Sequence, residues 1–499
     1  MCGIFLLVNH SNTIYARESF EKGAHRGPDN SKFFIHDNLC VGFHRLAING
    51  LDDLSNQPFF MNGIILVCNG EIYNHQELFQ IMNIVPTTHS DCEIIVHLYL
   101  RYGIEHTLHL INASEFAFVL FDTTKNLIYA ARDPYGVRPL FQGSFGHSLC
   151  FASELKMIPK EMHVKHVTPG TITDGTTERT YCTLPSINPS MTNPDVLIYQ
   201  TLYECVRTRV INTDRPMACL LSGGLDSSLI AMMVSRCRQE LGFVDPLETY
   251  SIGLEGAEDL KYASIMADFL GSKHTSIIVK EEDFLNAIPE VIYAIESHDT
   301  TTVRASVGNY LVAKYIKENS DAKVIFNGDG SDEVCGGYLY MKNAPDGLEF
   351  DKECRRLVKD IYHFDALRSD RCISHHGLEA RTPFLDRAFV EFYLSIPVHL
   401  RFTSCEKELL RRSFEGRMPP NILWRRKEAF SDGVSSLEKP WYSIIHRHVS
   451  TDSTDGLNQE RKYYKNIYDS FFSQDLLPYY WMPKYTNSKD CSARTLEMY

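Results

Sequence analysis

Residues 217–234 read MACLLSGGLDSSLIAMMV, a short apolar run followed by a glycine turn and a second apolar stretch with helical spacing. Gly223 and Gly224 can expose successive backbone N–H groups, and the start of a helix adds the positive end of its dipole. Ser222 and Ser227 supply hydroxyl donors beside that turn. The stretch therefore predicts an anion-binding turn between a strand and a helix. It is not a Walker A loop, because no lysine follows the glycines.

A carboxylate in this turn indicates a metal ion. Asp226 would repel a bound phosphate unless a divalent cation lay between them. Asp332, in the stretch AKVIFNGDGSDEVCGGY (322–338), follows another apolar run and can share that cation. A third run, ETYSIGL (248–254), also ends near a glycine. Ligands of open α/β sheets bind at the carboxyl ends of the strands, so three such ends predict one nucleotide site.

The pattern of the chain changes near residue 184. Residues 1–183 consist mainly of short apolar runs separated by Gly, Asn and Asp, which is typical of strands and turns. SDCEIIVHLYLRYG (90–103) is an exception with helical spacing. LPSINPSMTNP (184–194) has the composition of a linker, and from residue 195 longer helical segments alternate with compact apolar runs. This alternation predicts an α/β domain with a mostly parallel sheet flanked by helices.

Composition limits the class of protein. A chain of 499 residues is too long for one hydrophobic core, so two or three domains are expected. A formal net charge of −13 argues against general affinity for nucleic acid or anionic membranes. The 14 cysteines form no CxxC pair, which favours reduced thiols in a cytoplasmic protein. No apolar run approaches the ~20 residues of a membrane-spanning helix.

The first residues, MCGIFLLV, raise the possibility of an N-terminal nucleophile. A thiol attacks as the thiolate and therefore needs a base. If Met1 is removed, the freed α-amine of Cys2 can serve, because such amines titrate near ~7.7–8.0. The alternative is a buried strand that simply begins with a small residue.

Three other stretches complete a possible site for glutamine. LVCNGEIYN (66–74) ends a strand at Asn69 and Gly70, whose amide groups can hold an oxyanion. HRLAI (44–48) contains Arg45, whose planar guanidinium suits a carboxylate, and HSDCE (89–93) contains Asp91, which can accept from an ammonium group. Together with Cys2 they predict hydrolysis of the side-chain amide of glutamine.

Several motifs resemble known families. SGGLDSS resembles the pyrophosphate loop of the PP-loop ATP pyrophosphatases. The synthetase domain of glutamine-dependent asparagine synthetases is similar in four further stretches, TTVRAS (301–306), GDGSDEVCGGY (328–338), HGLEARTPFLD (376–386) and RRKEAFSDG (425–433). HRGPD (25–29) and RDPYGVRPL (132–140) resemble the class II glutamine amidotransferases.

The resemblance implies a fold and a reaction. It implies an α+β N-terminal-nucleophile sandwich with α/β/β/α layers over 1–183, a linker over 184–194 and the PP-loop domain over 195–499. Glutamine, aspartate and ATP would be the substrates, with Mg²⁺ as cofactor and a homodimer as a possible assembly. Ammonia released from glutamine would attack β-aspartyl-AMP and yield asparagine, AMP and diphosphate.

The same resemblance assigns site residues. The catalytic set is Cys2, Asn69, Gly70 and Asp329. Glutamine would be bound by Arg45, Leu46, Ala47, Ile48, Asn49, Asn69, Gly70, Glu71 and Asp91. ATP would be bound by Leu221, Ser222, Gly223, Gly224, Asp226, Ser227, Ile252, Arg304, Asn327, Gly328 and Lys427. Asp226 and Asp332 would hold the metal.

One departure leaves alternatives open. The family usually has serine and glutamate where this chain has Asn327 and Asp329, so the second carboxylate stands on a shorter stem. A catalytic group displaced by ~1 Å can cost ~100-fold in rate. The alternatives are another amide-forming PP-loop synthetase, or a pseudoenzyme with a binding or regulatory role.

Overall fold

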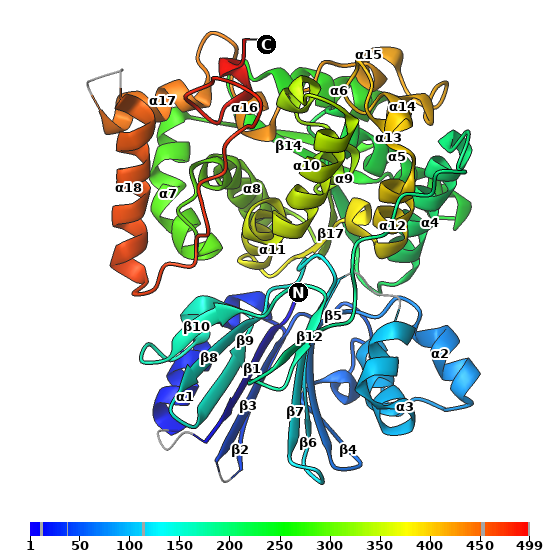
Figure 1. Cartoon of the computed structure of the whole chain (residues 1–499), viewed down its shortest axis with the longest axis vertical. Coiled ribbons are helices and arrows are strands. Elements are labelled where there is room, and N and C mark those ends of the chain that lie inside the picture. The colour runs from blue at the N-terminus through cyan, green and yellow to red at the C-terminus, as the bar shows by residue number, and fades with distance from the viewer. Residues whose placement is uncertain (10–12, 37, 112–114, 451–454, 498–499) are drawn as a thin grey trace. The chain divides into compact units, whose positions relative to one another are not determined.

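The computed structural model describes residues 1–9, 13–36, 38–111, 115–450 and 455–497 (Figure 1). The chain divides into two compact units. The first unit comprises Met1–Thr183, Asn212–Arg215 and Ser374–Glu379, and the second comprises Leu184–Ile211, Pro216–Ile373 and Ala380–Tyr499. Residues 184–194 form neither helix nor strand. No helix within the described ranges is both long and apolar enough to cross a membrane.

The first unit contains two antiparallel sheets, each of six strands. The first has the order β10-β8-β9-β1-β3-β2, and the second has the order β12-β11-β7-β6-β5-β4. The strands are β1 Gly3–Val8, β2 Asn30–His36, β3 Leu39–Arg45, β4 Phe59–Met61, β5 Ile64–Glu71, β6 Glu115–Asp122, β7 Leu127–Arg132, β8 Phe141–Phe145, β9 Ser148–Ala152, β10 His163–His166, β11 Thr171–Thr173 and β12 Glu178–Thr180. Its helices are α1 Thr13–Glu21, α2 His75–Met82 and α3 Ile94–Leu110.

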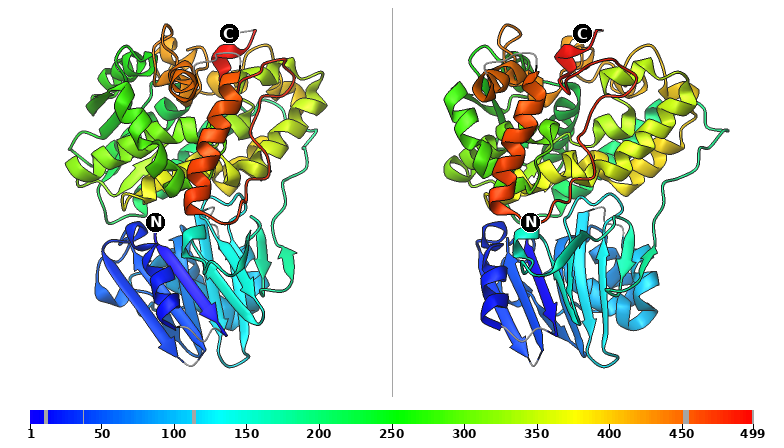
Figure 2. Two further views of the ribbon diagram at one scale, coloured as in Figure 1. Left: turned by 90° about the vertical axis from the view of Figure 1, so that its left-hand side faces the viewer. Right: turned by 60° about the vertical axis from the view of Figure 1, so that its left-hand side comes forward.

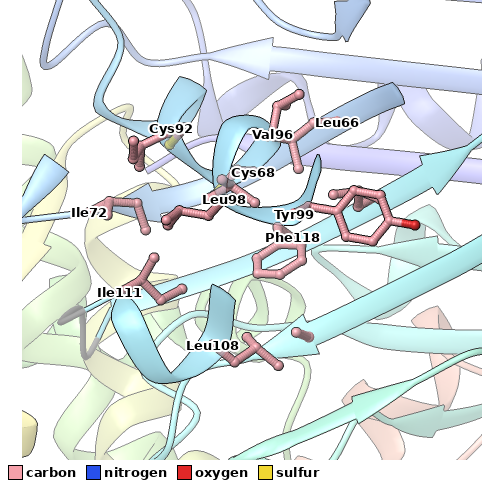
Figure 3. Close-up of a cluster of buried hydrophobic side chains, with 14 of the residues drawn as sticks. Leu66, Cys68, Ile72, Cys92, Val96, Leu98, Tyr99, Leu108, Ile111 and Phe118 are labelled. Atoms are coloured by element: carbon pink, nitrogen blue, oxygen red, sulfur yellow. The ribbon is translucent and has the colours of Figure 1, made fainter. Parts of the chain in front are cut away.

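Strand β5 shows why these sheets stack. Successive side chains of a strand point to opposite faces. Ile65 and Val67 therefore join a core that also contains Ile4 and Leu6 of the first sheet. Leu66 on the other face joins a second core that includes residues of α2 and α3, part of which Figure 3 shows. The second sheet is thus buried on both faces.

Helix α1 covers the outer face of the first sheet. Its Phe20 ring lies 5.1 Å from that of Phe33 and 6.1 Å from that of Phe5, measured between centroids. On the far side, Ile94 and Leu98 of α3 are fully buried against the second sheet, as the spacing in 90–103 predicts. The layers are therefore α/β/β/α, which confirms the expected sandwich.

The second unit is built on a five-stranded sheet of order β15-β14-β13-β16-β17 (Figures 1 and 2). Three of its strand pairings, β15 with β14, β14 with β13 and β13 with β16, are parallel. The strands are β13 Met217–Leu220, β14 Glu248–Leu254, β15 Lys273–Val279, β16 Val324–Phe326 and β17 Glu379–Arg381. The expectation of a mostly parallel sheet flanked by helices is confirmed.

Helices surround this sheet. They are α4 Asp195–Ile211, α5 Leu225–Glu240, α6 Glu258–Leu270, α7 Glu281–Ile295, α8 Thr300–Asn319, α9 Ser331–Cys335, α10 Gly347–Asp360, α11 Asp365–Ser374, α12 Arg387–Ser395, α13 Val398–Arg401, α14 Glu408–Arg412, α15 Pro420–Leu423, α16 Phe430–Gly433, α17 Trp441–Val449 and α18 Gly456–Phe471. Strand β13 lies between β14 and β16, so the three glycine-punctuated strand ends are neighbours.

The stacked sheets give a stability prediction. Leu6 is fully buried between them, so Leu6→Ala should lower the free energy of unfolding by about 2–5 kcal/mol. Ile14, on α1, is 74% exposed, and Ile14→Ala should change it by less than about 0.5 kcal/mol. Denaturant unfolding of both variants measures the difference. Equal effects would contradict the described core.

Candidate active sites

Cys2 lies at the start of β1, next to the end of β3. The pairing of Gly3 with His44 brings Cys2 beside Leu46, whose carbonyl oxygen accepts from the Cys2 thiol at 3.6 Å. The backbone N–H of Cys2 donates to Asn69 Oδ1 at 2.8 Å. Burial raises the pKa of the Cys2 thiol to about 11. The thiol is therefore protonated at neutral pH, and its use as a nucleophile requires a base.

Asn69 presents an unused donor beside this thiol. Its side chain is fully buried, and its Nδ2 has no hydrogen-bond partner among the described residues. Gly70 follows with φ of 153°, and a Cβ there would lie 2.3 Å from the carbonyl oxygen of Glu115. A buried free N–H group next to a thiol is the arrangement that an oxyanion intermediate requires.

Arg45 organises the segment that follows β3. Its terminal nitrogens donate to the backbone carbonyl oxygens of Asn49, Gly50 and Asp52 and to Asn56 Oδ1. Leu46, Ala47 and Ile48 are buried in this segment.

Residues from other stretches hold the same segment in place. Asp29 accepts from the Ala47 N–H at 2.8 Å, and Asp214 accepts from the Gly50 N–H at 2.9 Å. Arg26, also from HRGPD, donates to the carbonyl oxygen of Cys2 at 2.9 Å.

Two carboxylates border the predicted glutamine site. Asp91 accepts from the Ile72 N–H at 2.6 Å, and burial raises the pKa of its carboxyl group. Glu71 accepts from the side-chain amide of Asn49. The predicted contacts for glutamine therefore come from the neighbouring ends of β3 and β5 and from the residues just before α3.

Glu379, which the sequence did not assign to a site, contacts the N-terminus. The Met1 ammonium group forms a buried ion pair with Glu379 Oε2 at 3.2 Å. Glu379 belongs to HGLEARTPFLD, which the motif comparison linked only with the synthetase half. No local pattern joins residues 378 positions apart, so the sequence offered no signal for this contact.

A second site lies at the carboxyl ends of the parallel strands in the second unit. A cavity opens there and is lined by eleven of the predicted residues: Leu221, Ser222, Gly224, Asp226, Ser227, Ile252, Asn327, Gly328, Asp329, Asp332 and Lys427. They come from the turn after β13 and the start of α5, from the end of β14, from the turn after β16 and the start of α9, and from the segment before α16.

Gly223 shapes the turn without lining the cavity. It has φ of 70°, and a Cβ there would lie 2.2 Å from the carbonyl carbon of Tyr262. The turn therefore passes so close to α6 that only glycine fits. Ser222 and Ser227 exchange a hydroxyl hydrogen bond of 3.0 Å across it.

Four charged side chains meet at the mouth of this turn. Lys407 Nζ lies 2.7 Å from Asp226 Oδ1 and 2.5 Å from Asp332 Oδ1. Lys427 Nζ lies 2.5 Å from Asp332 Oδ2 and 3.6 Å from Asp226 Oδ2. Burial disfavours the ionised Asp332, but the two lysines outweigh it and hold the pKa of this carboxyl group below its usual range. Within the described ranges, no cluster of three His, Cys, Asp or Glu side chains could hold a metal ion.

Further polar residues line the cavity beside Asp329. Arg368 donates to Asp329 Oδ1 at 2.7 Å and to Asp365 Oδ1 at 3.2 Å. The Tyr338 hydroxyl oxygen lies 2.6 Å from Glu333 Oε1 and 3.0 Å from Asp365 Oδ2. Burial raises the pKa of Asp329 and of Glu333.

The sequence analysis did not assign Lys407, Asp365, Arg368 or Tyr338 to a site. Tyr338 closes the motif GDGSDEVCGGY and could have been chosen, but the other three stand outside any glycine turn.

Arg304, which the sequence predicts to bind phosphate, lies apart from the other predicted residues of this site. Arg304 is absent from the cavity lining and is 2% exposed. Its guanidinium pairs with Glu460 at 2.5 Å and with Asp490 at 2.7 Å. Two carboxylates thus accept from its guanidinium group, and the structure does not bring Arg304 together with the residues that line the cavity.

The fold and the two sites define a class of protein. An α/β/β/α sandwich with Cys2 beside a free amide donor is typical of an N-terminal-nucleophile amidotransferase. A glycine turn with buried lysine and aspartate pairs at the carboxyl edge of a parallel sheet is typical of an ATP-dependent synthetase. The chain combines both.

Comparison with known proteins identifies the family. The family model described as asparagine synthase matches residues 197–350 and 342–479, and that of the glutamine amidotransferase domain matches 1–180. The glutamine-hydrolysing asparagine synthetases of Mus musculus and Homo sapiens are 38% and 37% identical over 558 residues, covering 100% of this chain and 99% of each relative. The chain belongs to the family of glutamine-hydrolysing asparagine synthetases.

A solved structure is also similar. The glutamine phosphoribosylpyrophosphate amidotransferase from B. subtilis, complexed with ADP and GMP, is 17% identical with a TM-score of 0.33. The match covers 56% of this chain and 81% of that one.

The close approach of Gly223 to α6 gives a testable prediction. Gly223→Ala should lower ATP-dependent diphosphate release by about 100-fold, because the turn must move to admit the methyl group. Gly242→Ala is the matched control, since Gly242 also has a positive φ, 83°, but a Cβ there meets nothing within 4 Å. Steady-state diphosphate assays compare the two. Equal losses in the two variants would contradict the importance of the contact with Tyr262.

Proposed function

We propose that this chain synthesises L-asparagine from L-aspartate, using ATP and ammonia released from L-glutamine. Glutamate, AMP and diphosphate are the other products, and β-aspartyl-AMP is the intermediate. One observation carries the proposal: a single chain of this family holds both a partly buried Cys2 beside the unpaired Asn69 Nδ2 and a nucleotide-type turn in a polar cavity.

The first unit supplies ammonia in this proposal. After removal of Met1, the α-amine of Cys2 takes the proton of its own thiol, which then attacks the glutamine amide carbon. Asn69 Nδ2 and the Gly70 N–H stabilise the oxyanion. Ammonia leaves, and water hydrolyses the thioester to glutamate.

The glutamine substrate is oriented by two opposite charges. Arg45 faces its α-carboxylate and Asp91 its α-ammonium group, with residues 46–49 and Glu71 shaping the rest of the site. The buried position of Asp91 supports this role, because a buried carboxylate gains most from a cationic partner.

The second unit uses ATP, and the family implies Mg²⁺ as its cofactor. The residues present fit such an ion, because Asp226 and Asp332 offer carboxylate oxygens and already hold the cationic Lys407 between them. Bound Mg²⁺ would neutralise phosphate charge and favour departure of diphosphate. Lys427 and the N–H groups of the 222–224 turn bind the phosphates in this proposal.

Aspartate is recognised by the polar residues beside Asp329. Glu333 and Asp365 accept from its α-ammonium group, and Arg368 faces its α-carboxylate. Asp329 lies in the same cavity despite its shorter stem, where Arg368 holds it at 2.7 Å. This placement favours an active enzyme over a pseudoenzyme.

We also propose a cytoplasmic location and a homodimer. None of the fourteen cysteines, all of which lie in the described residues, is in a disulfide, which supports a reducing compartment. The homodimer rests on the family resemblance alone, and light scattering after size-exclusion chromatography tests it.

The decisive assay supplies purified protein with ATP, Mg²⁺, aspartate and glutamine. Formation of asparagine, AMP and diphosphate supports the proposal. Glutaminase activity without aspartate-dependent diphosphate would overturn the synthetase half.

Cys2→Ala separates the two reactions. The variant should lose glutamine-dependent synthesis, because no other group replaces the thiolate. Synthesis from added ammonium should continue, since the second unit is unchanged. Asparagine is measured with each nitrogen source, and survival of the glutamine-dependent reaction would contradict the role of Cys2.

Two substitutions test the catalytic role of Asp329, one that removes the charge of its side chain and one that lengthens it. Asp329→Asn should lower asparagine synthesis by about 100-fold or more if the carboxylate acts in proton transfer or charge stabilisation. Asp329→Glu, which restores the residue usual in the family, should keep most of the activity. Glutaminase activity, measured in parallel, serves as the control. Full synthesis by Asp329→Asn would remove Asp329 from the catalytic set.

A further inference from the structure

The segment Ser488–Leu496, which we call the strap, packs against the segment Arg425–Ser436 that carries Lys427. Arg494 makes the main contacts. It donates to Glu428 Oε1 at 2.7 Å and to the backbone carbonyl oxygen of Ser436 at 2.7 Å. A single guanidinium thus joins the residue next to Lys427 with the end of the segment, on both sides of α16.

A second contact reinforces the first. Asp432, buried within α16, accepts from Ser492 Oγ at 2.6 Å and from the Ala493 N–H at 2.9 Å. Figure 1 shows the chain after α18 returning to α16, where these residues meet. The strap therefore holds the Lys427 segment through one charged side chain and one buried carboxylate.

Arg304 anchors the strap to the body of the second unit. Its Nη1 donates to Asp490 Oδ1 at 2.7 Å, and its Nε donates to Glu460 of α18 at 2.9 Å. Arg304 stands on α8, which also contributes Thr301 and Ala305 to the cavity lining. The strap is thus fixed to a helix that forms part of the cavity wall.

The other side of the Lys427 segment is fixed to the nucleotide turn. Arg425 donates to Asp259 Oδ1 at 2.7 Å and to the backbone carbonyl oxygen of Ser222 at 3.3 Å. Lys427 lies in the chain between Arg425 and the residues held by the strap, and its ammonium group forms an ion pair with Asp332. A segment held at both ends keeps a long lysine side chain in one position.

We propose that the strap is a positioning element of the ATP-dependent half, in which Arg494 fixes the segment that presents Lys427 to the bound nucleotide. The inference rests on the proposed function for its catalytic consequence. It also makes a structural claim that holds without activity: the 425–436 segment is ordered by Arg494.

Arg494→Ala tests both parts. We expect kcat for aspartate-dependent diphosphate release to fall by about 10- to 100-fold, because a displaced Lys427 no longer meets the charge that develops on the phosphates. KM for glutamine and the glutaminase rate should not change. Added guanidinium ion should restore part of the lost rate, a recovery that a general folding defect would not show. Lys489→Ala, an exposed change within the strap, is the matched control and should behave as the unaltered chain.

Hydrogen exchange supplies a readout that needs no activity. Backbone amides of 425–436 should exchange at least about ten-fold faster in Arg494→Ala than in Lys489→Ala. If Arg494→Ala does not fold, Ser492→Ala removes only the hydroxyl bonded to Asp432 and should give a smaller change in the same direction.

The outcomes are separable. An unaltered chain that releases no aspartate-dependent diphosphate overturns the proposed function, and the exchange rates still decide the structural claim. A normal rate of asparagine synthesis and normal hydrogen exchange of 425–436 in Arg494→Ala would overturn the proposal that the strap positions Lys427. Parallel loss of glutaminase and synthesis without rescue by guanidinium also overturns it, because the defect is then not confined to the Lys427 segment.

Discussion

Two carboxylates and two ammonium groups balance one another at the centre of the second unit, and the rest of that unit depends on this balance. Lys407 is 1% exposed and Asp226 is 15% exposed. Ions removed from water to this degree cost several kcal/mol each unless they are paired. The turn after β13, the turn after β16 and two later segments must therefore meet within a few ångströms. A nucleotide that enters the cavity meets charges whose positions are already fixed, so little reorganisation is needed at the moment of reaction.

The candidate site in the first unit differs, because most of the polar groups that surround the Cys2 thiol are uncharged. Its proposed nucleophile is a neutral, partly buried thiol, and its neighbours include backbone carbonyl groups and the Asn69 amide. Strand pairing fixes the positions of such groups, because the hydrogen bonds between neighbouring strands hold both backbones in place. The second unit instead relies on long lysine and arginine side chains, which need additional contacts to remain in one place. The strap contacts of Arg494 are of this kind.

The sequence predicted those parts of both sites that local geometry determines. The turn at 222–224 and the pair Asn69–Gly70 follow from glycine at the end of an apolar run, and the alternation in β5 follows from the period of a strand. The position of Arg304 outside the cavity lining could not be predicted, because a motif gives the identity of a side chain but not the direction in which it points. Lys407, Arg368 and Glu379 escaped prediction for a related reason. Each acts through an ion pair with a residue distant in sequence, and only the folded chain brings such partners together.

The ion pair between Met1 and Glu379 can form only after translation has reached residue 379. A ribosome adds about 5–20 residues per second, so roughly 20 seconds or more pass between the emergence of the first residue and the synthesis of residue 379. During this interval the N-terminal amine has no buried carboxylate to pair with. Residues 1–183 therefore complete neither the charge balance around Met1 nor the first unit, which also requires 212–215 and 374–379. The carboxylate that pairs with the Met1 ammonium group therefore lies in the last part of the first unit to be synthesised.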